Sequence, residues 1–177
     1  MKNILVLFSS VDGQTLKICN YIKDLLADEG FNIQVASIDS HHKINTNYDF
    51  ILIGASIRYG GYRHSLYKFI QNNLYELEMV KTGFFSVSAI ARKIGRDIPE
   101  TDHYFEKFKR KSDWTPCIAG IFAGSISYPK YNFFDRFMIQ AIMYLTNGPT
   151  DSSKVFEFTD WSKVRLFATQ ISYILKQ

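Results

Sequence analysis

The strongest constraint on the fold of this chain is a series of short, almost wholly apolar runs that alternate with stretches of helical periodicity. Residues 4–8, 50–54, 83–87 and 117–123 are runs of this kind. They predict strands that are buried on both faces, because a half-exposed strand alternates apolar with polar residues. Residues 31–37 do alternate in that way, and they predict a strand at the edge of the sheet.

Apolar stripes at helical spacing lie between these runs. Residues 15–29 carry one such stripe, and Gly30 follows where a C-terminal cap belongs. Similar stripes predict helices over residues 66–77 and 164–175, and a weaker one over residues 100–111. Strands that alternate with helices predict an α/β fold with a doubly wound, five-stranded parallel sheet. No linker, repeat or low-complexity segment divides the 177 residues, so we expect a single domain.

One stretch, residues 124–153, departs from the alternation and reads as an insertion. It separates the fifth strand from residues 155–158, which predict a second piece of strand, so the insertion interrupts the fifth strand. Within it, residues 132–146 predict a helix of about 20 Å, too short to cross a bilayer core of about 30 Å. Apolar residues spread over both faces of this helix, so both faces need cover.

Composition limits the classes of partner. The chain has 21 Lys and Arg against 17 Asp and Glu, a formal charge of +4, which suits a membrane surface or an acidic small molecule. It lacks the dense basic run of a nucleic-acid binder, so we expect no nucleic acid. Its two cysteines, far apart and without CxxC spacing, fit a reducing cytoplasm. No metal-ligand spacing occurs among the histidines, so no metal site is predicted: they are His41, His42, His64 and His103.

Ligands of an open parallel sheet bind beyond the carboxyl ends of its strands, so the loops after the first, third and fourth strands are the candidate sites. The first loop combines small hydroxyl residues and a glycine with the start of a helix, which suits a phosphate. It lacks the signatures of a P-loop and of a dinucleotide-binding loop. The alternative is a plain turn that caps the helix. The residues concerned are Ser9, Ser10, Asp12, Gly13, Gln14 and Thr15.

The other two loops suit a planar ring, because glycines permit unusual backbone angles and Tyr59 can stack on a flat heterocycle. Together the three loops predict a mononucleotide with a large heterocycle. A receiver domain is excluded, since it needs an Asp at the end of the third strand, where Gly54 stands. The candidate ring-binding residues are Ser56, Ile57, Arg58, Tyr59 and Gly60 in one loop, and Ser86, Val87, Ser88, Ala91, Arg92 and Lys93 in the other.

Several of these motifs together resemble a known family. The sequence is similar to the menaquinone-dependent protoporphyrinogen oxidases of the HemG type, within the flavodoxin-like superfamily, and the resemblance covers nearly the whole chain. The motifs that carry it are Asp12-Gly13-Gln14-Thr15, Gly54 to Gly60, Ala91-Arg92-Lys93, Tyr128-Pro129-Lys130-Tyr131, Phe134-Asp135-Arg136-Phe137-Met138-Ile139 and Thr159-Asp160-Trp161.

The resemblance implies strand order 2-1-3-4-5, one FMN bound by the three loops, and oxidation of protoporphyrinogen IX to protoporphyrin IX in haem biosynthesis. Electrons would pass to menaquinone or ubiquinone at the cytoplasmic face of the inner membrane. The flavin carries this chemistry, so no catalytic side chain is singled out. The substrate's propionates direct attention to five cations: Arg58, Arg92, Lys93, Lys130 and Arg136.

The insertion suggests a peripheral contact with the membrane. Residues 128–145 carry six aromatic residues, and we expect them to form a lid over the flavin at the membrane surface. The candidate covers for its outer face are lipid, quinone, porphyrinogen or a second protomer. A second protomer would make the protein a homo-oligomer. Two other functions remain open: a flavodoxin-type electron carrier and a quinone reductase that uses NAD(P)H.

Overall fold

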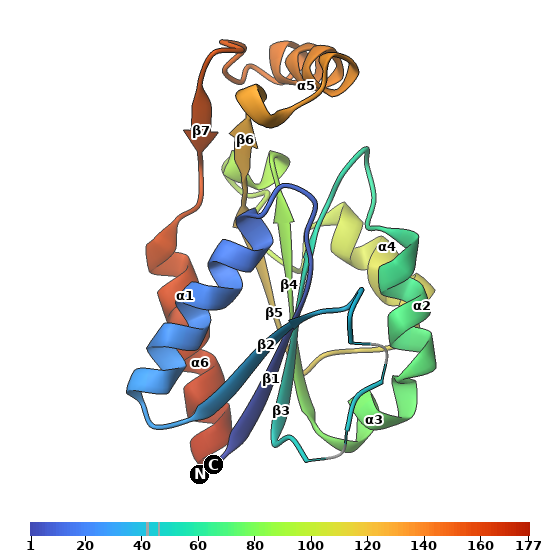
Figure 1. Ribbon diagram of the computed structural model, residues 1–177, viewed down its shortest axis with the longest axis vertical. Coiled ribbons are helices and arrows are strands. Elements are labelled where there is room, and N and C mark those ends of the chain that lie inside the picture. Colours follow the sequence, from blue (N-terminus) through green and yellow to red (C-terminus); the bar gives the residue numbers. More distant parts are fainter. Residues whose placement is uncertain (42, 46) are drawn as a thin grey trace.

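The computed structural model describes residues 1–41, 43–45 and 47–177 (Figure 1). Its main sheet has five parallel strands in the order β2-β1-β3-β4-β5, which confirms the predicted α/β architecture. The central strands are buried almost throughout, whereas β2, at the edge, alternates between exposed and partly buried residues. The strands are β1 (Asn3–Ser9), β2 (Asn32–Ser37), β3 (Phe50–Ser56), β4 (Lys81–Ser88) and β5 (Ile118–Ala123).

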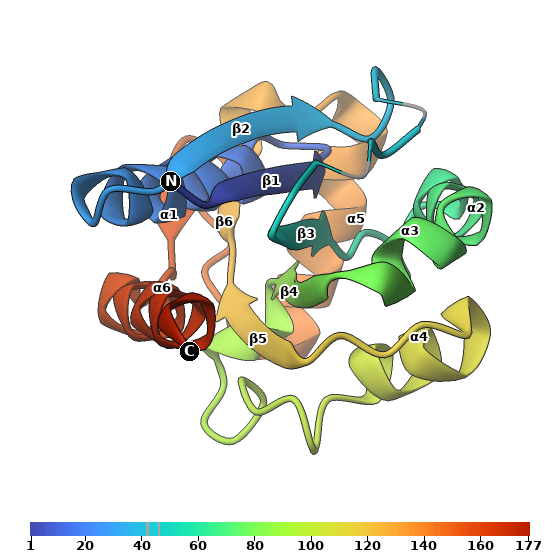
Figure 2. The ribbon, with the colours of Figure 1, turned by 90° about the horizontal axis from the view of Figure 1, so that it is seen from below.

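Helices cover both faces of this sheet (Figure 2). Helices α1 (Gln14–Asp28) and α6 (Trp161–Lys176) lie on one face, and α2 (His64–Asn72), α3 (Leu74–Met79) and α4 (His103–Ser112) lie on the other.

Aromatic residues fill much of the core on each side of β4. Adjacent residues of a strand point to opposite faces. Phe84 accordingly packs beneath α4, with its ring centroid 4.3 Å from that of Phe108, while Phe85 lies 5.6 Å from Phe122 on the α6 side. The high aromatic content of the chain thus serves two separate apolar layers.

The apolar stripe over residues 66–77 predicts one helix, but the structure divides it into α2 and α3 at Asn73. The Asn73 side chain is buried, and its Oδ1 accepts a hydrogen bond from the Ile44 N–H at 2.8 Å. Its Nδ2 donates to the Phe69 carbonyl oxygen, also at 2.8 Å. An asparagine that hydrogen-bonds to the backbone in this way competes with helical hydrogen bonds, which explains the break.

The insertion stands above the carboxyl edge of the sheet (Figure 1). It contains β6 (Ser125–Ser127), the short helix η2 (Tyr128–Lys130) and α5 (Phe133–Leu145), and β7 (Val155–Glu157) follows it. This strand, predicted as a second piece of the fifth strand, does not rejoin the main sheet but pairs antiparallel with β6, because the chain reverses direction through α5 before it returns. Asn132 caps α5 by accepting a hydrogen bond from the Asp135 N–H at 2.8 Å. Among the described residues, no helix is both long and apolar enough to span a membrane.

Candidate functional site

A pocket of about 480 Å³, here called the large pocket, lies at the carboxyl edge of the sheet. The loops after β1, β3 and β4 line it from below and α5 lines it from above, and its volume is typical of a small-molecule site. It brings together most of the residues predicted from sequence: Ser10, Asp12, Gln14, Thr15, Ser56, Ile57, Arg58, Tyr59, Gly60, Val87, Ser88 and Arg92.

The loop between β1 and α1 has the geometry of an anion site. Gly13 adopts a left-handed conformation with φ 90°, which glycine adopts at little cost. Its N–H donates to Ser10 Oγ at 3.0 Å, which shapes the turn. The chain then enters α1 directly, and the first N–H groups of a helix have no partner within the helix. Together with the helix dipole, these groups favour an anion at this point.

Thr15 gives the clearest sign of a ligand-binding position. The residue is 0% exposed, and its Oγ1 has no hydrogen-bond partner among the residues that the structure describes. Buried hydroxyls are nearly always hydrogen-bonded, because leaving one unpaired is costly. Thr15 stands in the first turn of α1, beside the free N–H groups, so a phosphate at this position fits the donors present.

Gln14 and Lys17 turn instead toward the ribbon of β6 and β7. Gln14 Nε2 donates to Thr159 Oγ1 at 2.8 Å, and Lys17 Nζ forms an ion pair with Glu157 Oε2 at 2.6 Å. Burial raises the pKa of Glu157, but the hydrogen bond and charge of Lys17 outweigh it, so that the pKa falls below its ordinary value. The nearest lysine of α1 is therefore neutralised, and the anion site consists of neutral donors.

A tight turn after β3 forms one side of the large pocket. The Arg58 N–H donates to the Gly61 carbonyl oxygen at 3.0 Å. The Gly61 N–H donates in turn to the Arg58 carbonyl oxygen at 3.2 Å. The two residues between them, Tyr59 and Gly60, have φ of 51° and 77°. Positive φ at both central positions is typical of a type I′ turn. The turn leaves Tyr59 59% exposed at the rim of the pocket.

Arg58 is neutralised by two carboxylates. Its Nη1 lies 2.6 Å and 2.5 Å from the two Asp12 oxygens, and its Nη2 lies 2.9 Å from Asp135 Oδ2. Burial alone would lower the pKa of Arg58, but hydrogen bonds with Tyr59 and Asp12 outweigh it and raise the pKa above its ordinary value. Asp12, predicted from sequence as a phosphate ligand, therefore presents its carboxylate to an arginine.

Arg92, in the short helix η1 (Ile90–Arg92), is bonded only to neutral oxygens within the described part of the chain. Its Nη1 donates to the Ala89 carbonyl oxygen at 2.7 Å, and its Nη2 donates to Thr146 O at 3.1 Å and Oγ1 at 2.9 Å. Burial lowers the pKa of Arg92 from its ordinary value. The guanidinium also lies over the Phe158 ring, 5.7 Å from its centroid. Arg92 thus keeps an uncompensated positive charge at the pocket wall.

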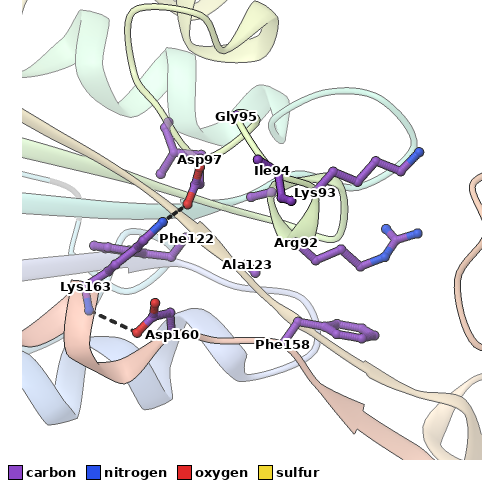
Figure 3. A pocket seen from close by; sticks show the side chains of 12 residues that line it. Arg92, Lys93, Ile94, Gly95, Asp97, Phe122, Ala123, Phe158, Asp160 and Lys163 are labelled. Carbon is purple, nitrogen blue, oxygen red and sulfur yellow. Dashed lines mark hydrogen bonds and ion pairs between the residues drawn. The ribbon is translucent and has the colours of Figure 1, made fainter.

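A smaller pocket of about 290 Å³ lies beside Arg92, between the loop after η1 and the start of α6 (Figure 3). Ala91 and Lys93 line it, together with Arg92. Figure 3 shows Arg92 and Lys93 on one side of this pocket and the ion pair of Lys163 with Asp97 on the other. Three of the predicted residues therefore meet here.

The remaining predicted residues line neither pocket. Ser9 is buried at the end of β1, and Ser86 Oγ, also buried, accepts a hydrogen bond from the Tyr62 hydroxyl at 2.9 Å. Arg136 Nη2 donates to the Tyr131 carbonyl oxygen at 3.3 Å. Lys130 is exposed, and Gly13 contributes backbone only.

No cluster of three or more candidate metal ligands occurs among the described residues. His42, one of the histidines considered from sequence, lies outside them.

The sequence predicts residues 128–145 as a lid over the site, but it does not single out most of the side chains that form the upper wall of the large pocket. Its members come from α4, from the segment after β5 and above all from α5. The apolar pattern of α5 signals burial, but it does not say which side chains face a ligand. The residues missed are Ala89, Ile90, Tyr104, Gly124, Ser125, Ile126, Tyr131, Ile139, Ile142, Met143 and Thr146.

The outer side of α5 is a large exposed apolar patch. Of the helix residues, all of which the structure describes, Met143 alone is buried. Exposed apolar surface of this extent marks an interaction site in soluble proteins. We call these residues the α5 patch: Phe133, Phe134, Phe137, Tyr144 and Leu145, which are 63–88% exposed.

Comparison with known proteins agrees with this geometry. The flavodoxin domain model matches residues 5–153, and the flavodoxin domain implies a flavin cofactor. Among solved structures, oxidised flavodoxin 1 from Bacillus cereus aligns over 97% of this chain and 98% of its own, with a TM-score of 0.54 and 15% identity. A flavodoxin from the domain Archaea aligns over 99% of both chains, with a TM-score of 0.54 and 13% identity. The chain is therefore a member of the flavodoxin domain family.

Two relatives narrow the assignment. The protoporphyrinogen IX dehydrogenase [quinone] of Escherichia coli (strain K12) is 38% identical over 96% of this chain and 94% of its own length. The protein of the same name from Leishmania major is 41% identical over 95% of this chain and 74% of its own length. Within the flavodoxins, the chain thus belongs to the family of these oxidoreductases.

Proposed function

We propose that this protein oxidises protoporphyrinogen IX to protoporphyrin IX with a bound FMN and passes the electrons to a membrane quinone, menaquinone or ubiquinone. When bound, FMN supplies the hydride and electron transfer. The protein's part is to hold the flavin, admit the porphyrinogen and keep both within reach of the membrane. The relatives' shared name supports this choice of substrate and acceptor.

The single observation that carries the FMN assignment is the buried, unpaired hydroxyl of Thr15 among the described residues. In the proposed complex, Thr15 Oγ1 and the first N–H groups of α1 donate to the phosphate. Ser9, Ser10, Gly13 and Gln14 shape that turn. The turn around Tyr59 and the loop after β4 border the ring, and the remaining volume of the large pocket accommodates it.

Arg92 and Lys93 are the proposed contacts for the substrate's propionates. Arg92 has no carboxylate partner within the described residues, and Lys93 is exposed beside it in the small pocket. A cation without a fixed counter-charge attracts an anionic group more strongly than one already paired. Lys130, exposed at the start of the insertion, is a further candidate, whereas Arg136 contacts the Tyr131 backbone.

The α5 patch supports peripheral contact with the cytoplasmic face of the inner membrane. An exposed row of aromatic and aliphatic side chains suits the boundary between headgroups and acyl chains. The formal charge of +4 favours anionic headgroups. Residues 128–145 would then bring apolar quinone and porphyrinogen to the large pocket from the membrane surface.

Anaerobic turnover tests this function. The purified, FMN-loaded protein is mixed with protoporphyrinogen IX, with and without a menaquinone analogue, and porphyrin fluorescence is followed. We expect porphyrin to form continuously only when the quinone is present. Quinone reduction by NAD(P)H, without porphyrin formation, would identify a quinone reductase instead. Reversible flavin reduction without turnover of either substrate would identify an electron carrier.

A further inference from the structure

Arg58 joins three segments that are far apart in the sequence. It stands in the turn after β3, and its guanidinium contacts Asp12 in the loop before α1 and Asp135 in the first turn of α5. The distances are 2.5 Å to Asp12 Oδ2 and 2.9 Å to Asp135 Oδ2. One side chain therefore connects the proposed phosphate loop to the helix above the large pocket.

This cluster is shielded from solvent. The side chains of Arg58, Asp12 and Asp135 are 14%, 29% and 21% exposed. The Tyr59 hydroxyl hydrogen-bonds to the other oxygen of Asp135, and the Tyr131 ring lies 5.1 Å from the guanidinium. A planar guanidinium donates to two carboxylates at once, and partly buried pairs are screened less by salt than surface pairs. The Arg58 guanidinium is thus suited to hold the two carboxylates in fixed positions.

Helix α5 depends on such polar contacts because little of it is buried. Met143 is its one buried residue among the described positions, and the aromatic side chains at its start face outward. Asp135 fixes its first turn to Arg58, and Thr146, just after its last turn, receives the hydrogen bonds of Arg92. The two ends of the helix are therefore fixed by arginines from the two loops that border the large pocket.

We propose that Arg58 is a positioning residue that couples FMN binding to the docking of α5, so that each stabilises the other. This inference rests on the proposed function, because it takes the loop before α1 to hold the phosphate. A phosphate beside Asp12 meets a carboxylate whose charge Arg58 balances. If α5 moves away, Asp135 leaves Arg58, and the cluster that orders Asp12 loses one of its three charged members. Coupling between two binding events is reciprocal, so bound FMN in turn holds α5 in place.

The test uses the full chain and the variant Asp135→Asn. FMN release is followed by the recovery of flavin fluorescence, and the docking of α5 by the rate at which chymotrypsin cuts within residues 133–145. In the unmodified protein, FMN should slow this cleavage. In Asp135→Asn, FMN release and cleavage of the loaded protein should both accelerate by about tenfold, within the range of coupling between residues in contact.

A second variant separates coupling from a general loss of structure. With Arg58→Gln as background, adding Asp135→Asn should change FMN release by less than about twofold, because the charged partner of Asp135 is already absent and only the hydrogen bond from the Tyr59 hydroxyl remains. Arg63→Gln is the matched control. Arg63 follows the same turn, and its ion pair with Asp39, at 2.8 Å, is more exposed, so its loss should change neither rate.

The outcomes distinguish this inference from the proposed function. Failure of the unmodified protein to bind FMN would overturn both. Tight FMN binding together with cleavage of α5 that is independent of FMN would overturn the coupling and leave the function standing. Equal acceleration by Asp135→Asn in the unmodified protein and in the Arg58→Gln background would overturn it too. If Arg58→Gln does not fold, the dependence of cleavage on FMN in Asp135→Asn decides the matter, since coupling predicts that FMN no longer protects α5.

Discussion

Replacing Thr15 by valine should stabilise the flavin-free protein but weaken its binding of FMN. Thr15 is 0% exposed, and Oγ1 finds no partner among the described residues. Valine has nearly the same shape as threonine but lacks the hydroxyl. The substitution therefore removes a polar atom with little change in packing, which isolates the contribution of that one atom.

The magnitudes follow from the state of the hydroxyl. A buried polar group without a partner costs about 1–3 kcal/mol, so Thr15→Val should raise the free energy of unfolding of the flavin-free protein by about 1 kcal/mol or more. In the FMN complex the same atom donates to a phosphate, and its loss should weaken binding by about 1–3 kcal/mol. At 1.4 kcal/mol per factor of ten, the dissociation constant should rise by about 5- to 150-fold.

Two measurements check this prediction: a flavin-fluorescence titration for affinity, and urea denaturation of the flavin-free protein for stability. Thr15→Ser keeps the hydroxyl and should keep most of the affinity. Thr169→Val removes an exposed hydroxyl that bonds within α6, so it should leave FMN binding unchanged. Wild-type affinity in Thr15→Val would show that Oγ1 does not meet the phosphate, and the assignment of this loop would be wrong.

Three further predictions concern substrate, membrane and core. Arg92→Ala should raise the apparent KM for porphyrinogen severalfold at unchanged flavin content. The control Thr146→Val keeps the cation and should leave this KM unchanged. Loss of flavin in Arg92→Ala would instead make Arg92 a cofactor ligand. Phe137→Asp should retain FMN and the fold but lower liposome flotation and turnover together, and wild-type values for both would refute the membrane contact. Gly54→Ala should lower the free energy of unfolding by about 1–3 kcal/mol, because its Cβ would overlap the Phe85 ring, and an unchanged urea midpoint would contradict this packing.

The sheet could be predicted from the sequence because its signal is local. Each buried run is short and apolar, and an apolar stripe at helical spacing predicts each helix that packs on the sheet. The break at Asn73 could not be predicted in this way, because its cause is a hydrogen bond from Ile44, which lies 29 residues earlier. The antiparallel pairing of β6 with β7 likewise depends on where α5 returns the chain.

The candidate site was predictable to a similar extent. The loops after β1, β3 and β4 do meet at the large pocket, as the rule for parallel sheets requires. The sequence did not reveal which partners the individual charged side chains have. Asp12 reads as a phosphate ligand in the sequence, yet its partner is Arg58, whose second partner, Asp135, is 77 residues away. A pattern of residue types does not reveal which charges pair across the fold.

The half-reactions of the flavin test the central claim most directly. In an anaerobic stopped-flow experiment, protoporphyrinogen IX is mixed with the FMN-loaded protein, and flavin absorbance and porphyrin fluorescence are recorded together. We expect the flavin to bleach as porphyrin appears, and a menaquinone analogue added afterwards to restore the oxidised spectrum. A flavin that stays oxidised in the presence of protoporphyrinogen IX, in protein that is fully loaded with FMN, would contradict the central claim.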